Sequence, residues 1–182
     1  MRIKTHKGSI SRVALTAIFL RLFIVGSTAS AAVKGDWSIL GSSEYEIGKD
    51  KDVYHIKSPS CYIRSMGWPE GYGMVVNQIK AKPFIGKRVR MSAYIKTERV
   101  TEWAGMTMRV DGKNPNDRLG FDNMHARPIR GTTEWQRYEI VLDVPQSAKT
   151  IIFGLLLAGP GKAWLDDYTF DVVGSDVSTT GF

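Results

Sequence analysis

The chain has 182 residues, of which 43% are hydrophobic and 24% charged, as in an ordinary globular protein with room for one sizeable core. Its formal net charge is +7, from 25 basic and 18 acidic residues. Five of the basic residues lie within the first 21 positions, before any acidic residue: Arg2, Lys4, Lys7, Arg12 and Arg21. Without them, 20 basic residues face 18 acidic ones, and this balance argues against a nucleic-acid-binding protein.

The N-terminus has the pattern of a secretion signal. A basic segment, "MRIKTHKGSISR", precedes the apolar "VALTAIFLRLFIVG", and Ala29-Ser30-Ala31 supplies a small-x-small cleavage site. Arg21 interrupts the apolar run, which is therefore shorter than the roughly 18 residues of a transmembrane helix. We predict a signal peptide over residues 1–31, cleavage after Ala31 or Ala32, and a secreted or periplasmic protein with no transmembrane segment after cleavage. An uncleaved membrane anchor is the alternative.

The rest of the chain reads as short strands. Residues 88–100, 105–112 and 135–145 alternate between apolar and polar side chains, as strands with one buried face do. Residues 150–159 form a continuous apolar run, which suits a strand buried on both faces. Turn signals separate the segments, at 67–71, 82–86, 111–117, 130–134, 144–148 and 158–162.

No segment after the signal shows a sustained helical period, so the sequence predicts an all-β fold. The expected architecture is a two-sheet antiparallel β-sandwich over residues 35–174. The small and polar residues 175–182 are expected to form a flexible tail.

The last predicted strand, "AWLDDYTFDVV" over residues 163–173, carries two adjacent acids, Asp166 and Asp167. Neighbours on a strand point to opposite faces, so the two acids cannot act together unless a bulge re-aims one of them. Alternation places Asp166 on the aromatic core face with Phe170, and Asp167 on the polar face. A buried carboxylate needs hydrogen bonds, a cation or a metal, so we expect Asp166 to lock this strand into the sandwich.

A family resemblance supports this fold. The segment "GTTEWQRYEIVLDVPQSAKTIIFGLLLAGPGKAWLDDYTFDVV" resembles the C-terminal half of a galactose-binding-like jelly roll, as in carbohydrate-binding modules of secreted glycosidases. The upstream "KRVRMSAYIKTERVTEWAGMTMRVDG" is similar to jelly-roll accessory domains of secreted bacterial peptidases and esterases. The resemblance covers roughly residues 36 to 173. It implies a jelly roll and carbohydrate binding. We expect Asp166 to be a hydrogen-bonded structural residue, and the resemblance offers a structural calcium ion at Asp166 as the alternative.

Catalytic motifs are absent from the sequence, which has no G-x-S-x-G, H-E-x-x-H, P-loop or C-x-x-C pattern. We therefore expect no enzymatic activity, although His125, close to Asp122, leaves a hydrolase as an alternative. Cys61 is the only cysteine, which excludes an intrachain disulfide and indicates a small buried hydrophobic residue.

Sugars bind to aromatic faces flanked by hydrogen-bonding side chains. The candidate ligand-binding residues come from turn-like stretches and from one polar strand face: Trp68, Tyr72, Trp103, Arg109, Asp111, Asp122 and Asn123. Arg109 and Asp111 have a plain alternative as an ion pair, and "FDNM" has one as an Asx-type turn.

The sequence thus predicts a non-catalytic binding module for carbohydrate or cell-envelope glycan. The alternative is a protein-interaction or structural envelope module that partners a separately encoded enzyme.

Overall fold

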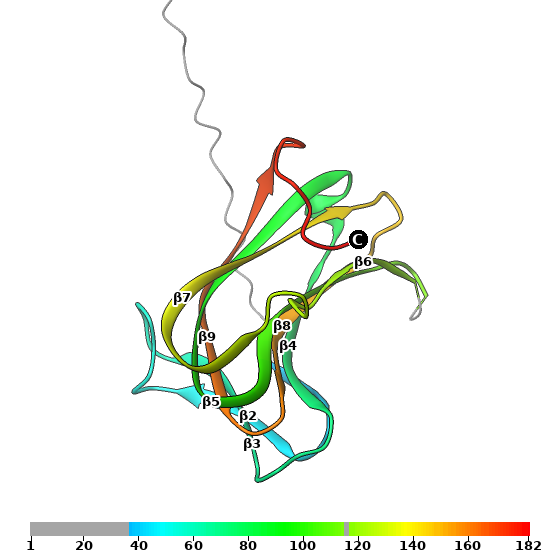
Figure 1. Ribbon diagram of the computed structural model, residues 1–182. Coiled ribbons are helices and arrows are strands. Elements are labelled where there is room, and N and C mark those ends of the chain that lie inside the picture. The colour runs from blue at the N-terminus through cyan, green and yellow to red at the C-terminus, as the bar shows by residue number, and fades with distance from the viewer. Residues whose placement is uncertain (1–36, 115–116) are drawn as a thin grey trace, which may run out of the picture.

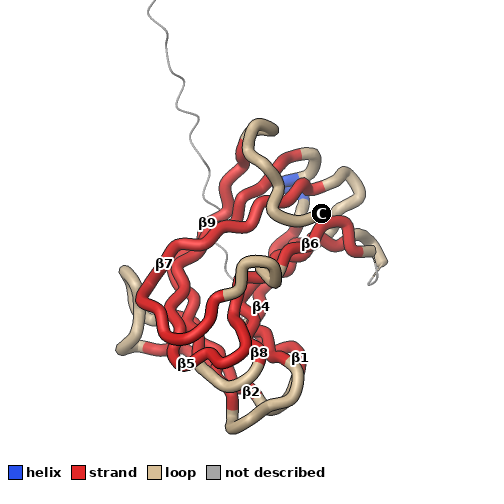
Figure 2. Tube along the Cα trace, viewed as in Figure 1, coloured by secondary structure: helices blue, strands red, loops and turns tan. Residues whose placement is uncertain are grey.

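A computed structural model of the protein describes residues 37–114 and 117–182, and the predicted signal peptide lies outside these ranges. The described chain consists of strands joined by loops, with one short 3-10 helix, η1 (Lys82–Phe84) (Figure 2). The strands in chain order are β1 (Ser38–Gly41), β2 (Tyr45–Asp50), β3 (Ser60–Ser65), β4 (Tyr72–Lys80), β5 (Lys87–Asp111), β6 (Arg118–Asp122), β7 (Ile129–Val144), β8 (Thr150–Ala158) and β9 (Lys162–Val173). No helix within the described ranges has the length and apolar character that crossing a bilayer requires.

The strands form two layers that share β5. The hydrogen-bonded order is β1-β4-β8-β5-β9-β3-β2, and β6 and β7 also pair with β5. The first half of β5 pairs with β7 and β9, and its second half pairs with β8 and β6. Layer A therefore contains β2, β3, β9, most of β7 and the first half of β5. Layer B contains β1, β4, β8, β6 and the second half of β5 (Figure 1). All these pairings are antiparallel, which confirms the predicted sandwich.

β5 and β7 bend together where they pass from one layer to the other (Figure 1). Arg99 has a positive φ of 50°, Gly131 has one of 72°, and the β5–β7 register shifts around the paired Val100 and Gly131. The sequence predicted a turn at residues 130–134 and placed Trp103 in a turn-like stretch. Both predictions were wrong, because the chain bends there through bulges and stays paired as strand.

The core lies between the layers and is formed by the residues that alternation predicted. Met91 of layer A and Met106 of layer B are completely buried, and the rings of Phe153 and Phe170 join β8 to β9 edge-on at 4.9 Å. Cys61 is buried, and desolvation raises the pKa of its thiol to about 12. This environment agrees with the expected role of Cys61 as a small apolar residue.

The C-terminal tail, for which the sequence predicts flexibility, runs beside the edge strands of both layers. The backbone N–H of Thr180 donates to the carbonyl of Val141 in β7 at 2.9 Å, and Phe121 N–H in β6 donates to the carbonyl of Phe182 at 2.7 Å. An ideal Cβ on Gly181 would lie 2.1 Å from the carbonyl oxygen of Phe121, so only glycine fits this approach. The tail therefore bridges β7 and β6, near the point marked C in Figure 1.

Candidate functional site

One outer face of layer B brings together several of the predicted ligand-binding residues. Ala158 of β8 pairs with Tyr72 on one side and with Trp103 on the other. Paired residues share a face, and the neighbouring Leu157 is completely buried in the core, so Tyr72 and Trp103 point outward in one row. We call the outward-facing residues of these three strands the platform: Tyr72, Met74, Val76, Gln78 and Lys80 of β4, Thr150, Ile152, Gly154, Leu156 and Ala158 of β8, and Trp103, Gly105, Thr107, Arg109 and Asp111 of β5.

The middle of the platform combines two glycines, Gly105 and Gly154, with larger residues such as Leu156. An ideal Cβ on Gly154 would lie 1.9 Å from the carbonyl oxygen of Val75, so no side chain can stand at this position. Beside it, Gln78 and Ile152 line a hollow of about 300 Å³ together with Leu40 of β1. Leu156, Thr107 and Val76 are buried, so the open part of the platform is this hollow beside β1.

Trp103 lies at the edge of the platform that the β6–β7 connection covers. Its ring meets the ring of His125 edge-on at 5.5 Å, and an ideal Cβ on Gly105 would lie 2.9 Å from Cβ of Met124 and 3.0 Å from the carbonyl oxygen of Asn123. Tyr72, at the other end of the row, is 49% exposed. Two aromatic side chains thus flank Ala158 with part of their surfaces open to solvent.

Arg109 and Asp111 form an ion pair at the other end of the platform. The guanidinium donates to Oδ2 of Asp111 from Nε at 3.0 Å and from Nη2 at 2.7 Å. Asp111 is only 9% exposed, and its Oδ1 is buried without a hydrogen-bond partner among the described residues. Both residues belong to β5, and the guanidinium of Arg109 compensates the negative charge of Asp111.

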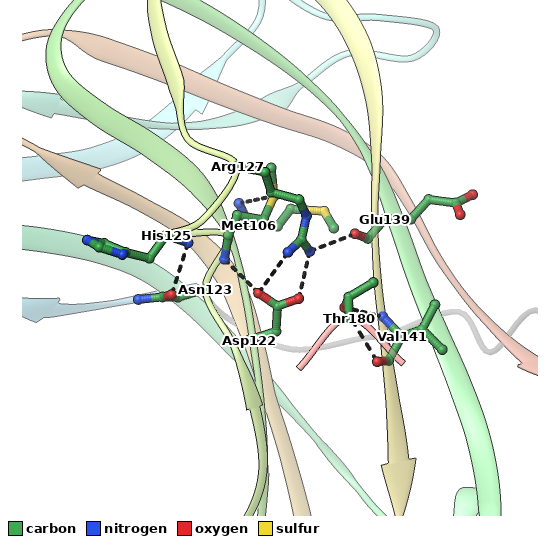
Figure 3. A network of polar contacts seen from close by, with 9 residues as sticks. Met106, Asp122, Asn123, His125, Arg127, Glu139, Val141 and Thr180 are labelled. Atoms are coloured by element: carbon green, nitrogen blue, oxygen red, sulfur yellow. Dashed lines mark hydrogen bonds and ion pairs between the residues drawn. The ribbon is translucent and has the colours of Figure 1, made fainter. Parts of the chain in front are cut away.

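Asp122 lies off the platform, because it pairs with Met108, whose side chain is in the core. The carboxylate of Asp122 accepts hydrogen bonds from Nη2 of Arg127 at 2.6 Å and from the backbone N–H of Met124 at 2.7 Å (Figure 3). Arg127 also donates to the carbonyl of Glu139 in β7 at 3.1 Å. Asp122 therefore ties the end of β6 to β7, and it binds Arg127 rather than His125.

Asn123 forms the Asx-type turn that the sequence offered as an alternative. Its Oδ1 accepts from the backbone N–H of His125 at 3.2 Å (Figure 3). The turn carries His125 to the edge of Trp103, so Asn123 shapes this edge of the platform through the loop it closes.

Trp68 lies apart from the platform, in the loop between β3 and β4. It is 84% exposed and lines a polar hollow of about 570 Å³ with Arg64, Arg99 and Pro160. The structure therefore divides the predicted ligand residues between the platform, this loop hollow and the β6–β7 connection.

A bulge in β9 changes the predicted faces of Asp166 and Asp167. Asp167 has a positive φ of 47°, and the β5–β9 register shifts between Ser92 and Tyr94. Phe170 lies in the core as predicted, whereas Leu165 is 1% exposed in the core although alternation placed it outside. Asp166 pairs with Tyr94 on the outer face, so its prediction as a core-face residue was wrong, and so was the opposite orientation expected for the two acids.

Both acids hold His55, which the sequence did not identify as important. His55 Nδ1 lies 2.7 Å from Asp167 Oδ2, and the His55 backbone N–H donates to Asp166 Oδ2 at 2.9 Å. The imidazole stacks on Tyr94 with ring centroids 3.7 Å apart. A bulge was the one exception under which the two acids could act together, but His55 lies 112 positions before Asp167 and no local pattern linked them.

The surroundings of Asp166 suit hydrogen bonding better than calcium. Its two oxygens accept from the backbone N–H groups of His55 and Asp167, both at 2.9 Å. Calcium takes six to eight oxygen ligands. Within the described ranges, no group of three or more His, Cys, Asp or Glu side chains is placed to hold a metal ion. Asp166 is thus satisfied by hydrogen bonds, and the calcium ion at Asp166 stays a prediction.

The chain is similar in sequence to a bacterial protein named as a transcriptional regulator. No family model matches it. Over 148 residues it is 40% identical to the uncharacterised HTH-type transcriptional regulator YbfP of Bacillus subtilis (strain 168), with 79% of this chain and 50% of the regulator covered. The chain thus spans about half the length of the curated relative that it matches.

Solved structures show the same fold. The CBM22-1 xylan-binding domain of Paenibacillus barcinonensis Xyn10C has a TM-score of 0.53 at 13% identity, covering 76% of this chain and 86% of that one. The C-terminal family 22 carbohydrate-binding module of Clostridium thermocellum Xyn10B has a TM-score of 0.53 at 12% identity, with coverages of 79% and 89%. These matches confirm the predicted jelly-roll sandwich of carbohydrate-binding modules, and at this identity they concern the fold alone.

Proposed function

We propose that the chain is a non-catalytic binding module and that a carbohydrate or cell-envelope glycan lies on the platform. The observation that carries the proposal is the row Tyr72–Ala158–Trp103, where two partly open aromatic rings flank a small residue. Sugar rings stack on such aromatic faces, and the hollow of about 300 Å³ lined by Leu40, Gln78 and Ile152 offers further room on the same face.

The test is binding to a panel of soluble polysaccharides, xylan among them, by titration calorimetry. Tyr72→Ala and Trp103→Ala should each weaken binding at least tenfold, about 1.4 kcal/mol. Trp135→Ala, a half-buried aromatic change in layer A, is the matched control and should leave affinity unchanged. Trp68→Ala tests whether the loop hollow contributes separately. A panel without any binder would contradict the proposal.

The relation to YbfP favours a second candidate, in which the sandwich is the ligand-recognising part of a regulator. A helix-turn-helix motif needs two helices, whereas the described residues of this chain contain η1 and no α-helix. The match covers 79% of the chain, and the residues outside the sandwich are too few to account for it. Most of the matched segment therefore lies in the sandwich. In this role the module would bind a small saccharide on the same platform and would not itself contact DNA.

The two candidates differ in where the protein acts. We propose export to the cell surface or periplasm, supported by the basic and apolar pattern of residues 1–31. Cell fractionation with N-terminal sequencing should then find a mature chain beginning at Ala32 or Val33. An unprocessed chain in the cytoplasm would favour the regulator role. Copurification of an envelope enzyme would favour the partner role that the sequence left open.

A further inference from the structure

The end of the platform opposite the aromatic row is basic. Lys80, Thr150, Asp111 and Arg118 pair in turn across β4, β8, β5 and β6. The guanidinium of Arg118 lies 4.6 Å from the ring centre of Phe121, which pairs with Arg109 and therefore faces outward. Lys80 and Arg118 thus flank this row on the outer side, about 14 Å apart across three strand spacings.

The two cations of this end form no ion pair within the described residues, and the acid next to Arg118 in the chain, Asp117, is exposed. Asp111 is the one acidic residue of the platform, and its carboxylate is buried and held by Arg109. Lys80 and Arg118 are both exposed, and neither forms an ion pair with an acidic side chain in the described part of the chain. Two exposed cations therefore stand beside an acid that is already paired, which favours an anionic group at this end.

Resting on the proposed function, we infer that the ligand is an acidic glycan, with its sugar rings on Tyr72 and Trp103 and its carboxylate or phosphate groups at Lys80 and Arg118. From Trp103 to Asp111, whose row contains Lys80 and Arg118, the strand extends about 26 Å, at about 3.3 Å per residue. The ligand must therefore span several sugars to reach both ends. Exposed charges are screened by salt, so affinity for the acidic glycan decreases as ionic strength rises.

The experiment compares an oligogalacturonate with its methyl ester, which has the same sugar backbone without the charges. Calorimetric titration of the whole protein should give at least tenfold tighter binding of the acid at low salt, and a smaller ratio at physiological salt. The double variant Lys80→Gln/Arg118→Gln should reduce that ratio towards one. Lys51→Gln/Lys57→Gln, which removes the same charge from the exposed β2–β3 loop, is the control and should keep the ratio. A poly(glycerol phosphate) arm shows whether phosphate can replace carboxylate.

The outcomes separate this inference from the proposed function. Equal binding of acid and ester, or binding only of neutral polysaccharides, overturns the acidic ligand and leaves glycan binding in place. Competition by duplex DNA as strong as that by the oligogalacturonate overturns it in favour of a nucleic-acid contact. Absence of binding to every saccharide tested overturns both.

Discussion

His55 and Asp167 are joined across the outer face of layer A by a hydrogen bond of 2.7 Å between Nδ1 and Oδ2. The side chains are 23% and 27% exposed, so the contact is partly shielded from water. Together with the stacking of His55 on Tyr94, it anchors the loop between β2 and β3 over the sheet. The adjacent acids of the last strand therefore serve one histidine, and the bulge at Asp167 makes this geometry possible.

Asp167→Ala should release this loop. Loss of a hydrogen bond to an ionised group costs about 2 kcal/mol when it is shielded from solvent, so the melting temperature should fall by several degrees. Amide hydrogen exchange over residues 51–59 should become faster, while the core strands keep their protection. Asp176→Ala, at an exposed acid in the tail, is the control. Unchanged exchange in the loop would show that the contact does not hold it.

Chelation should leave the melting temperature unchanged, because both oxygens of Asp166 already accept backbone hydrogen bonds. Asp166→Ala should in contrast destabilise the fold by about 2 kcal/mol, since it leaves the N–H groups of His55 and Asp167 without their acceptor. The check is a thermal melt with and without a chelator, repeated with added calcium. A midpoint that falls on chelation and recovers with calcium would establish the predicted metal at Asp166.

The alternation of apolar and polar side chains predicted the sandwich well, because one face of each strand is buried in the core and must be apolar. Met106, Met108 and Val110 are all completely buried, as their spacing indicated, and this places Arg109 on the outer face. The same rule failed at Leu165 and Asp166, where one extra residue in β9 reverses the faces. A bulge depends on pairing with a distant strand, so the sequence of one strand does not reveal it.

The candidate site also combines features that the sequence predicted with features that depend on distant strand pairing. The pattern within β5 predicted the outward position of Arg109, and "FDNM" contained the Asx-type turn of Asn123. Trp103 was expected in a turn because Gly and Thr surround it, whereas pairing with Ala158 keeps it in a strand. Tyr72 and Trp103 lie in one row because β4, β8 and β5 are neighbours in this order. A single sequence does not contain that strand order.

Asp50 should make stability depend on pH in the acid range. Burial disfavours its charged form, but hydrogen bonds from Trp164 at 2.9 Å, Lys162 at 3.1 Å and two backbone N–H groups outweigh burial and hold the pKa of Asp50 well below its ordinary value. A depressed pKa contributes stability that is present above the unfolded value and is lost as pH falls through the folded one.

Asp50→Asn should therefore lower the free energy of unfolding at pH 7 by about 2 kcal/mol. The difference from the unmodified protein should shrink once pH falls below about 4, where the unfolded carboxyl takes up its proton. Denaturant titrations at several pH values measure this difference. The exposed Asp52→Asn is the control, and a difference that stayed constant down to pH 2 would contradict the role of Asp50.

The variant Asp122→Ala tests whether the Asp122 carboxylate has a structural role or a ligand-binding role. The side chain of Asp122 is 6% exposed and clasps Arg127, so its removal leaves a guanidinium and the Met124 N–H without an acceptor. We expect a loss of about 2 kcal/mol in the free energy of unfolding, because the pair is only partly buried but the Met124 N–H also loses its acceptor. Asn123→Ala, which removes a single Asx bond, should cost about 1 kcal/mol.

The binding measurement decides between the two roles of Asp122. At a temperature where the Asp122→Ala variant is still folded, glycan affinity should remain within about twofold of the unmodified protein, because Asp122 faces away from the platform. Arg127→Ala should show the same pattern, since it breaks the same pair from the other side. A folded Asp122→Ala variant that lost glycan binding outright, while Arg127→Ala kept it, would place the Asp122 carboxylate in the binding site.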